Sequence, residues 1–232
     1  MRRLAIAVGL SLVAASCAPG APSAQSTSTV TAAPAGPAAA GPAALLGQAR
    51  RFVFRVRNPA CLSTGTAFAY AGTVVTNRHV AAGATTLQLS TWSGTDFNAS
   101  VGGHSGPFDL ARLTARPPAG TLPPAAGPAT PAVGSQVYVA GYPDGNQLTV
   151  TAGKVTGLTG AGVLGVSGPV LELSDTVKPG NSGSPLLDPS GRVVGVVFAY
   201  DPSRSQGLAM PLASLQSFLH GRPRHATLAC TA

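Results

Sequence analysis

The stretch KPGNSGSPLLD, residues 178–188, decides how this chain of 232 residues is interpreted. It holds two prolines, two glycines, two serines and an asparagine, and the apolar run GRVVGVVFAY, residues 191–200, follows it. A serine hydroxyl becomes a nucleophile only when a base takes its proton and backbone N–H groups face the oxyanion that forms. The glycines around Ser182 allow the amides of Gly180 and Ser182 to face one point. The stretch is therefore either a surface turn or the site of a nucleophilic Ser182.

A base and a carboxylate for such a serine occur earlier in the chain. His79 stands in VVTNRHVAAG, at the end of an apolar strand, and Asp109 stands between Phe108 and Leu110 in FDLARL. Each has a structural explanation when taken singly, because a lone histidine after a strand is often structural and an aspartate can cap a strand. Together they follow in the order His79, Asp109, Ser182, which is the chain order of the triad in chymotrypsin. The three residues are the candidate base, orienting carboxylate and nucleophile.

Short apolar runs bounded by turn residues make up most of the chain. Runs such as RFVFRVR, SQVYVAGYP and GRVVGVVFAY have strand length and are rich in Val, Phe and Tyr. Only two segments have a helical pattern, the short turn NRHVAAG and the segment PLASLQSFLHG. The segment 116–134 has six prolines and no strand pattern, so it separates two strand-rich halves. The strand pattern favours an all-β antiparallel sandwich or barrel fold with a C-terminal helix, and the linker suggests two small β-barrels. The expected parts are a first barrel at about 50–116, a linker at 117–134, a second barrel at about 135–210 and a helix at about 211–220.

The first residues have the pattern of an export signal. Arg2 and Arg3 precede a nearly continuous apolar run to Ala15, which is too short to span a bilayer as a stable helix. Residues 1–16 are therefore interpreted as a signal peptide, and Cys17 follows in a context similar to a bacterial lipobox, so we expect lipidation there. Residues 17–44 have no charged or aromatic side chain and predict a flexible tether. The folded domain is expected over 45–232, in an exported protein on the periplasmic side of the cell envelope, either lipid-anchored or secreted.

Three cysteines are an odd number for an exported chain. The count resolves if Cys17 carries lipid and Cys61 forms a disulfide with Cys230, whereas two free thiols are disfavoured in an oxidising compartment. No metal ligand set is expected, because the cysteines and the spare histidines His104, His220 and His225 lack ligand spacing. No cofactor is expected either.

The formal net charge is +8, and the arginines are scattered singly. Nucleic-acid recognition usually needs a basic stripe, and here aromatic residues are also few, so we expect no nucleic-acid partner. A monomer that acts on protein or peptide substrates, with membrane contact only through Cys17, is the expected state.

The segments TNRHV, FDLARL, GYPDG and KPGNSGSPLLDPSGRVVGVVF resemble those of the trypsin-like serine endopeptidases of the chymotrypsin clan, the S1 family. The resemblance covers about residues 51–230 and is closest to the bacterial branch with HtrA-type proteases and the actinobacterial MarP-type periplasmic proteases of acid resistance, here without a PDZ domain. It implies an all-β, chymotrypsin-like fold of two antiparallel six-stranded β-barrels with a C-terminal helix. It also implies an oxyanion hole made by Gly180 and Ser182. It also implies that Thr176 lies at the base of the pocket for the substrate residue before the cleaved bond.

Two departures from the family pattern, together with an uncharged pocket, refine this expectation. Asn181 stands where many animal members have aspartate, so activation through a salt bridge to a new N-terminus is not expected. Arg78 places a cation beside the histidine, which would favour acidic groups nearby. Neither Thr176 nor Val197, which matches a histidine of glutamate-specific relatives, carries charge, so the pocket is expected to accept small or medium apolar side chains.

An exported serine endopeptidase is the leading hypothesis. Because the base must be neutral to accept a proton, we expect activity to fall in acid. A catalytically silent trypsin-like fold that acts as a binding module is the alternative, although such proteins typically lose a triad residue and this chain keeps all three. An esterase is disfavoured because the nucleophile elbow G-x-S-x-G between strand and helix is absent. His104 would compete for the role of base only if His79 were dispensable.

Overall fold

The computed structural model describes residues 41–160, 163–175, 177–225 and 229–230. The expected signal peptide, most of the expected tether, Cys17 and Thr176 lie outside these residues. No helix among the described residues is long and apolar enough to cross a membrane.

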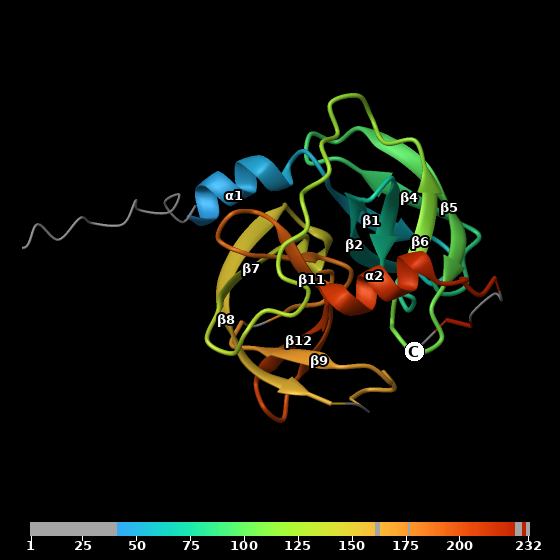
Figure 1. Ribbon diagram of the computed structural model, residues 1–232. Coiled ribbons are helices and arrows are strands. Elements are labelled where there is room, and N and C mark those ends of the chain that lie inside the picture. The colour runs from blue at the N-terminus through green and yellow to red at the C-terminus, as the bar shows by residue number, and fades with distance from the viewer. Residues whose placement is uncertain (1–40, 161–162, 176, 226–228, 231–232) are drawn as a thin grey trace, which may run out of the picture. The chain divides into compact units, whose positions relative to one another are not determined.

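Two closed antiparallel barrels of six strands each form the body of the molecule (Figure 1). The strand order is β1-β2-β3-β6-β5-β4 in the first barrel and β10-β11-β12-β9-β8-β7 in the second. The predicted fold class is thereby confirmed. The strands of the first barrel are β1 (Val53–Asn58), β2 (Ser63–Tyr70), β3 (Thr73–Thr76), β4 (Thr86–Ser90), β5 (Asp96–His104) and β6 (Ala111–Ala115). Those of the second are β7 (Gln136–Gly141), β8 (Thr149–Thr159), β9 (Val170–Leu173), β10 (Pro185–Leu187), β11 (Val193–Asp201) and β12 (Gln206–Pro211).

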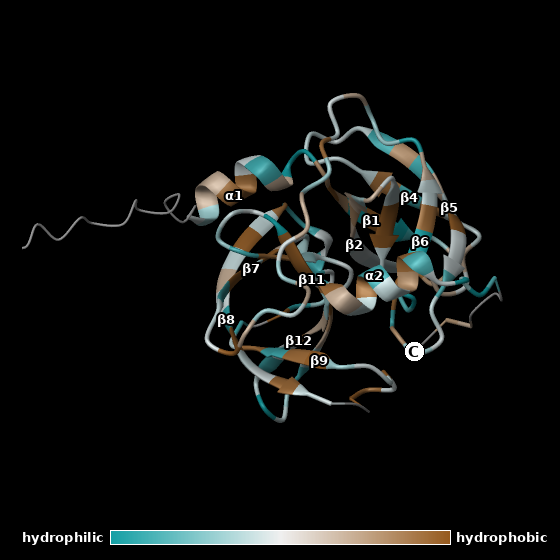
Figure 2. Cartoon of the chain, viewed as in Figure 1, coloured by the Kyte–Doolittle hydropathy of each residue, from teal (hydrophilic) through white to brown (hydrophobic). Residues whose placement is uncertain are grey.

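Apolar side chains alternate toward the barrel interiors. In β1, Phe54 and Val56 are buried whereas Arg55 is half-buried and Arg57 is exposed, which is the alternation expected of a half-buried strand. The hydropathy colouring of Figure 2 shows brown, apolar residues along strands of both barrels. One buried apolar cluster runs from the first barrel into its junction with the second, and a smaller one fills the second barrel. The barrels therefore share a continuous interface on which a site can be fixed.

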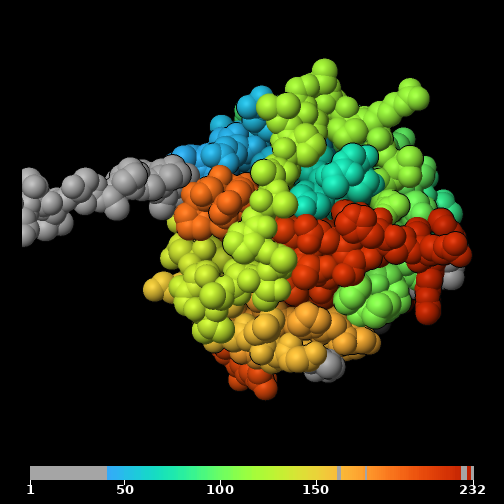
Figure 3. Space-filling model, viewed as in Figure 1, coloured from blue at the N-terminus to red at the C-terminus, as the bar shows by residue number. Residues whose placement is uncertain are grey.

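Helix α2 (Leu212–His220) joins the two barrels on one face. It packs on β11 and β12 of the second barrel, and Arg112 Nη2 of β6 donates a hydrogen bond of 2.5 Å to the carbonyl of Leu219. In the space-filling view its red atoms cover the surface between the green and the yellow-to-orange parts (Figure 3). Pro211 is its N-cap, so the expected helix at about 211–220 is present with its first residue in β12.

Two short elements differ from the sequence expectation. Helix α1 (Pro42–Ala49) begins inside the segment interpreted as a tether, and it is ordered because Leu45 and Ala49 are fully buried against the second barrel. A single 3-10 turn, η1 (Pro143–Gly145), lies between β7 and β8. The expected helical segment at 77–83 is a set of turns, with one helical hydrogen bond from the Ala81 N–H to the Asn77 carbonyl.

A disulfide joins Cys61 to Cys230, with an S–S distance of 2.02 Å and a sequence separation of 169 residues. It lies against the turn that follows His79, since a Cβ on Gly83 would stand 2.8 Å from Cys61 Sγ. The C-terminal segment also pairs with β5, where His104 and Arg224 exchange two backbone hydrogen bonds of 2.8 and 2.9 Å.

Candidate active site

The carboxylate of Asp109 is fixed by the segment that carries the histidine. Asp109 is 8% exposed, and its backbone carbonyl accepts hydrogen bonds from Asn77 Nδ2 at 2.7 Å and from the Arg78 N–H at 3.2 Å. Its Oδ1 accepts the backbone N–H of His79 at 3.1 Å. A buried carboxylate needs such partners, because an unpaired one would be costly to remove from water. The loop between β5 and β6 and the loop after β3 are thus locked together.

The ring of His79 is oriented by this carboxylate. Nδ1 of His79 lies 2.5 Å from Oδ2 of Asp109, and the histidine side chain is 35% exposed. In the neutral tautomer whose Nδ1 donates to this carboxylate, Nε2 is the acceptor. Arg78 Nε lies 3.8 Å from Oδ1 of the same aspartate, with its side chain also 35% exposed. The site therefore holds one carboxylate, one oriented imidazole and one cation at the surface.

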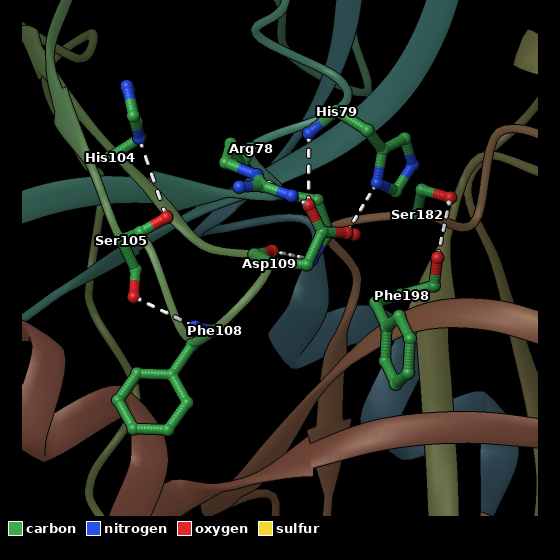
Figure 4. A network of polar contacts seen from close by, with 9 residues as sticks. Arg78, His79, His104, Ser105, Phe108, Asp109, Ser182 and Phe198 are labelled. Atoms are coloured by element: carbon green, nitrogen blue, oxygen red, sulfur yellow. Dashed lines mark hydrogen bonds and ion pairs between the residues drawn. The ribbon is translucent and has the colours of Figure 1, made fainter. Parts of the chain in front are cut away.

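Ser182 is brought to this histidine by contacts between the barrels. The Ser182 carbonyl accepts the Thr66 N–H of β2 at 2.8 Å, and a Cβ on Gly65 would lie 3.2 Å from that carbonyl and 2.7 Å from the side chain of Val80. Figure 4 shows the His79 ring between Asp109 and Ser182. The three residues named from the sequence thus converge at the junction of the two barrels.

The hydroxyl of Ser182 is turned away from the ring. Its Oγ donates to the carbonyl of Phe198 at 3.4 Å, and among the described residues no hydrogen bond joins it to His79 (Figure 4). Catalytic hydrogen bonds in unliganded sites are often long or misaligned and tighten when substrate binds.

The turn before Ser182 presents two free backbone donors. Asn181 N–H donates to the Lys178 carbonyl at 3.0 Å, and Gly180 has φ of +88°, as a type II turn with Pro179 before glycine requires. Within the described part of the chain, neither the N–H of Gly180 nor that of Ser182 donates a hydrogen bond. Both are therefore available to a negatively charged oxygen.

Close packing holds this turn against the β7–β8 connection. A Cβ on Gly180 would lie 2.3 Å from the carbonyl oxygen of Tyr142, so only glycine fits. The Asp144 N–H donates to the Pro179 carbonyl at 2.6 Å, and Thr66 Oγ1 donates to the Gly180 carbonyl at 2.7 Å.

The remaining sequence candidates lie elsewhere. Val197 is fully buried in the apolar cluster of the second barrel, and the residue that reaches the site is its neighbour Phe198, which the sequence reasoning did not single out. His104 is 4% exposed on β5 and lies on the far side of Asp109 from Ser182 in Figure 4. Thr176 falls outside the described residues. In those residues, no group of three or more His, Cys, Asp or Glu is placed to hold a metal ion.

Known proteins that resemble this chain are trypsin-like peptidases. The trypsin-like peptidase domain model matches residues 63–196. Among curated proteins, the chain is 34% identical over 151 residues to the chloroplastic Protease Do-like 1 of Arabidopsis thaliana, covering 61% of this chain and 34% of the relative. It is 35% identical over 136 residues to serine protease Rv3671c of Mycobacterium tuberculosis, covering 54% and 33%. The chain spans about a third of the length of these relatives.

Solved structures extend the likeness over more of the chain. The active form of the Rv3671c protease from M. tuberculosis superposes with a TM-score of 0.69 at 25% identity, over 81% of this chain and 89% of that one. The HtrA-type protease AlgW, solved with a tripeptide, gives a TM-score of 0.67 at 26% identity, over 76% and 62%. The resemblance to HtrA-type proteases noted in the sequence is confirmed. With more than half of its length matched by the family model, this chain belongs to the trypsin-like peptidase family.

Proposed function

We propose that this chain is a serine endopeptidase that hydrolyses peptide bonds through an acyl-enzyme. The observation that carries the proposal is the contact of 2.5 Å between His79 Nδ1 and Asp109 Oδ2, beside a serine that is flanked by free backbone donors. A buried carboxylate holds the ring of a half-buried histidine in one orientation. It is what a general base needs, because Nε2 must be the unprotonated nitrogen.

In the proposed reaction, Ser182 Oγ attacks the carbonyl carbon of the scissile bond while His79 Nε2 accepts the hydroxyl proton. Asp109 stabilises the imidazolium that results, without taking the proton itself. The N–H groups of Gly180 and Ser182 donate to the oxyanion of the tetrahedral intermediate. His79 then gives its proton to the leaving amine, and the same base activates the water that hydrolyses the ester on Ser182.

The substrate preference and location are part of this proposal. An uncharged pocket with Thr176 at its base would take small or medium apolar side chains, and Arg78 at the rim would favour acidic groups nearby. We place the protein outside the cytoplasm, because of the signal-like residues 1–16, with lipid on Cys17 as a possible anchor and the bond between Cys61 and Cys230 formed after export. Protein or peptide substrates and a monomeric state complete the proposal.

One observation favours the alternative of a silent fold used for binding. The Ser182 hydroxyl donates to Phe198 rather than to the histidine, which is the arrangement expected of a latent or inactive site. The two functions differ in whether a bound peptide is cut.

A peptide library incubated with the purified protein and analysed by mass spectrometry separates them. We expect cleavage by the wild type and by Ser184→Ala, and none by Ser182→Ala. Ser184 is a matched control, since it is fully buried in the same loop and its hydroxyl has no hydrogen-bond partner within the described structure. Equal cleavage by Ser182→Ala would refute the nucleophile, and no cleavage by the wild type would favour the binding module.

A further inference from the structure

A polar cavity of about 390 Å³ lies apart from His79, Asp109 and Ser182. It opens between β1, the β4–β5 turn and the β7–β8 connection, and we call it the arginine pocket. Its principal lining residues are Arg50, Arg55, Trp92 and Tyr142, together with residues 146–148. No acidic residue lines it.

Both arginines of the pocket lack an acidic partner. Arg50 stacks on the ring of Trp92, with its guanidinium carbon 4.4 Å from the ring centroid. Arg55 Nη1 donates to the Gly145 carbonyl at 3.3 Å, whereas its Nε is buried without a hydrogen bond. Neither makes an ion pair with any residue that the structure describes. Two cations therefore face one cavity with most of their donors unused.

Tyr142 adds a neutral donor to this cavity. It is 3% exposed, and its hydroxyl is buried without a hydrogen-bond partner among the described residues. Burial raises its pKa to about 12, so the hydroxyl stays protonated at any physiological pH. A buried polar group without a partner is costly, by about 1 to 3 kcal/mol, and its retention calls for a ligand or a water.

We propose that the arginine pocket binds a carboxylate of a polypeptide, either an acidic side chain or a chain terminus. Arg55 and Tyr142 would donate hydrogen bonds to the carboxylate oxygens. Trp92, which is 52% exposed, and the stem of Arg50 would cover the adjoining part of the peptide. Arginine and tyrosine donors together suit a planar anion, because a guanidinium can make paired N–H bonds to two oxygens.

A peptide fits this pocket better than a nucleic acid does. Nucleic-acid binding relies on a row of cations that follows the backbone and on several stacking aromatics. Here two arginines and one exposed tryptophan surround a single cavity, which is enough for one carboxylate and the chain next to it. The inference does not require Ser182, and it goes beyond the proposed peptidase activity.

The pocket shares a wall with the turn that precedes the nucleophile. Tyr142 lines the pocket, and its N–H donates to Thr66 Oγ1 at 3.1 Å, while this hydroxyl donates in turn to the Gly180 carbonyl. Gly145, whose carbonyl binds Arg55, follows Asp144, whose N–H holds Pro179. A carboxylate bound in the pocket would therefore lie against the same segment that supports the candidate oxyanion donors.

The only tryptophan of the chain, Trp92, reports directly on this pocket. The Ser182→Ala protein would be titrated with the blocked peptide Ac-Gly-Glu-Glu-Gly-NH2 while tryptophan fluorescence is followed, so that no cleavage interferes. We expect a saturable change that is weaker by at least tenfold in Arg55→Gln and in Tyr142→Phe, since each loses a hydrogen bond to a charged group. Arg57→Gln, which removes an exposed arginine two residues along β1 and outside the pocket, should bind as the parent does.

Several outcomes would overturn the proposal. These are the absence of a saturable change, equal binding of the glutamine peptide Ac-Gly-Gln-Gln-Gly-NH2, or an equal loss in Arg57→Gln, which would indicate a diffuse basic surface. Binding of inorganic phosphate as tightly as the peptide would assign the pocket to small oxyanions instead. If Arg55→Gln does not fold, Arg50→Gln replaces it, because Arg50 is exposed and its removal should still weaken binding severalfold.

Discussion

Replacing both disulfide cysteines, in Cys61→Ala/Cys230→Ala, should lower the free energy of unfolding by about 3 to 5 kcal/mol. The bond closes a loop of 169 residues, and the chain-entropy relation for a loop of that length gives about 5 kcal/mol at 25 °C. That figure assumes that the C-terminal segment keeps its place when the bond is absent. The structure supplies a reason for a smaller effect.

Among the described residues, the last backbone pairing before Cys230 is at Arg224, which exchanges two hydrogen bonds with His104, and Cys230 itself is exposed. If the six residues beyond Arg224 are released in the folded variant, the native state regains roughly 2 kcal/mol of chain entropy by the same relation. The net loss is then about 3 kcal/mol. The lower and the higher value thus differ only in whether the chain beyond Arg224 is released in the folded variant.

Urea unfolding followed by circular dichroism measures the change. Cys61→Ala alone should be destabilised as much as the double variant, because either substitution removes the bond. A loss below about 1 kcal/mol in the double variant would refute the reasoning, since the bridge would then place little constraint on the unfolded chain.

Three further changes test other parts of the site. Asp109→Asn places an amide where the histidine ring donates, which favours the wrong tautomer, so peptide hydrolysis at neutral pH should fall about 10⁴-fold; a loss under tenfold would contradict the role of the carboxylate. Gly183→Ala would set a Cβ 2.0 Å from the Thr66 carbonyl oxygen at φ of +87°, so thermal unfolding should show a free energy of unfolding lower by more than about 2 kcal/mol. The control Gly72→Ala has φ of +77° and nothing within 4 Å, so it should lose only about 1 kcal/mol. The pKa of Tyr142 is raised to about 12 in the folded state, so above about pH 10 this hydroxyl ionises in the unfolded chain first. The free energy of unfolding should therefore fall by roughly 2 kcal/mol between about pH 10 and pH 12. Urea titrations of Tyr142→Phe should lack this contribution.

The barrel strands could be predicted because each is short, apolar and bounded by glycine or proline. Helix α1 could not, since its eight residues continue an alanine- and proline-rich segment and carry no charge. Its order comes from tertiary packing. Leu45 is fully buried, and a Cβ on Gly191 would stand 2.0 Å from Gln48 Oε1, so the helix lies tightly against the turn before β11. Contacts between residues about 140 positions apart in the chain leave no pattern in the local sequence that would predict a helix.

The residues of the proposed triad could be named from their sequence contexts, but the contact that β11 makes with Ser182 could not. Strand β11 has an irregularity in its pairing with β12 between Val197 and Ala199. The intervening Phe198 has no partner in the register and turns its carbonyl to Ser182. A bulge re-aims side chains without a change of composition, so spacing alone misses it. The rotation of the Ser182 hydroxyl is equally invisible in the sequence.

The most direct test of the proposed peptidase is the intact mass of the folded protein after treatment with a fluorophosphonate probe. We predict one adduct on the wild type and on Ser184→Ala, and none on Ser182→Ala, because only a serine whose proton is taken by a neighbouring base attacks the phosphorus. An unmodified wild type would contradict the account and indicate that the hydroxyl stays with Phe198. An adduct that persists in Ser182→Ala would place the reactive group elsewhere in the chain.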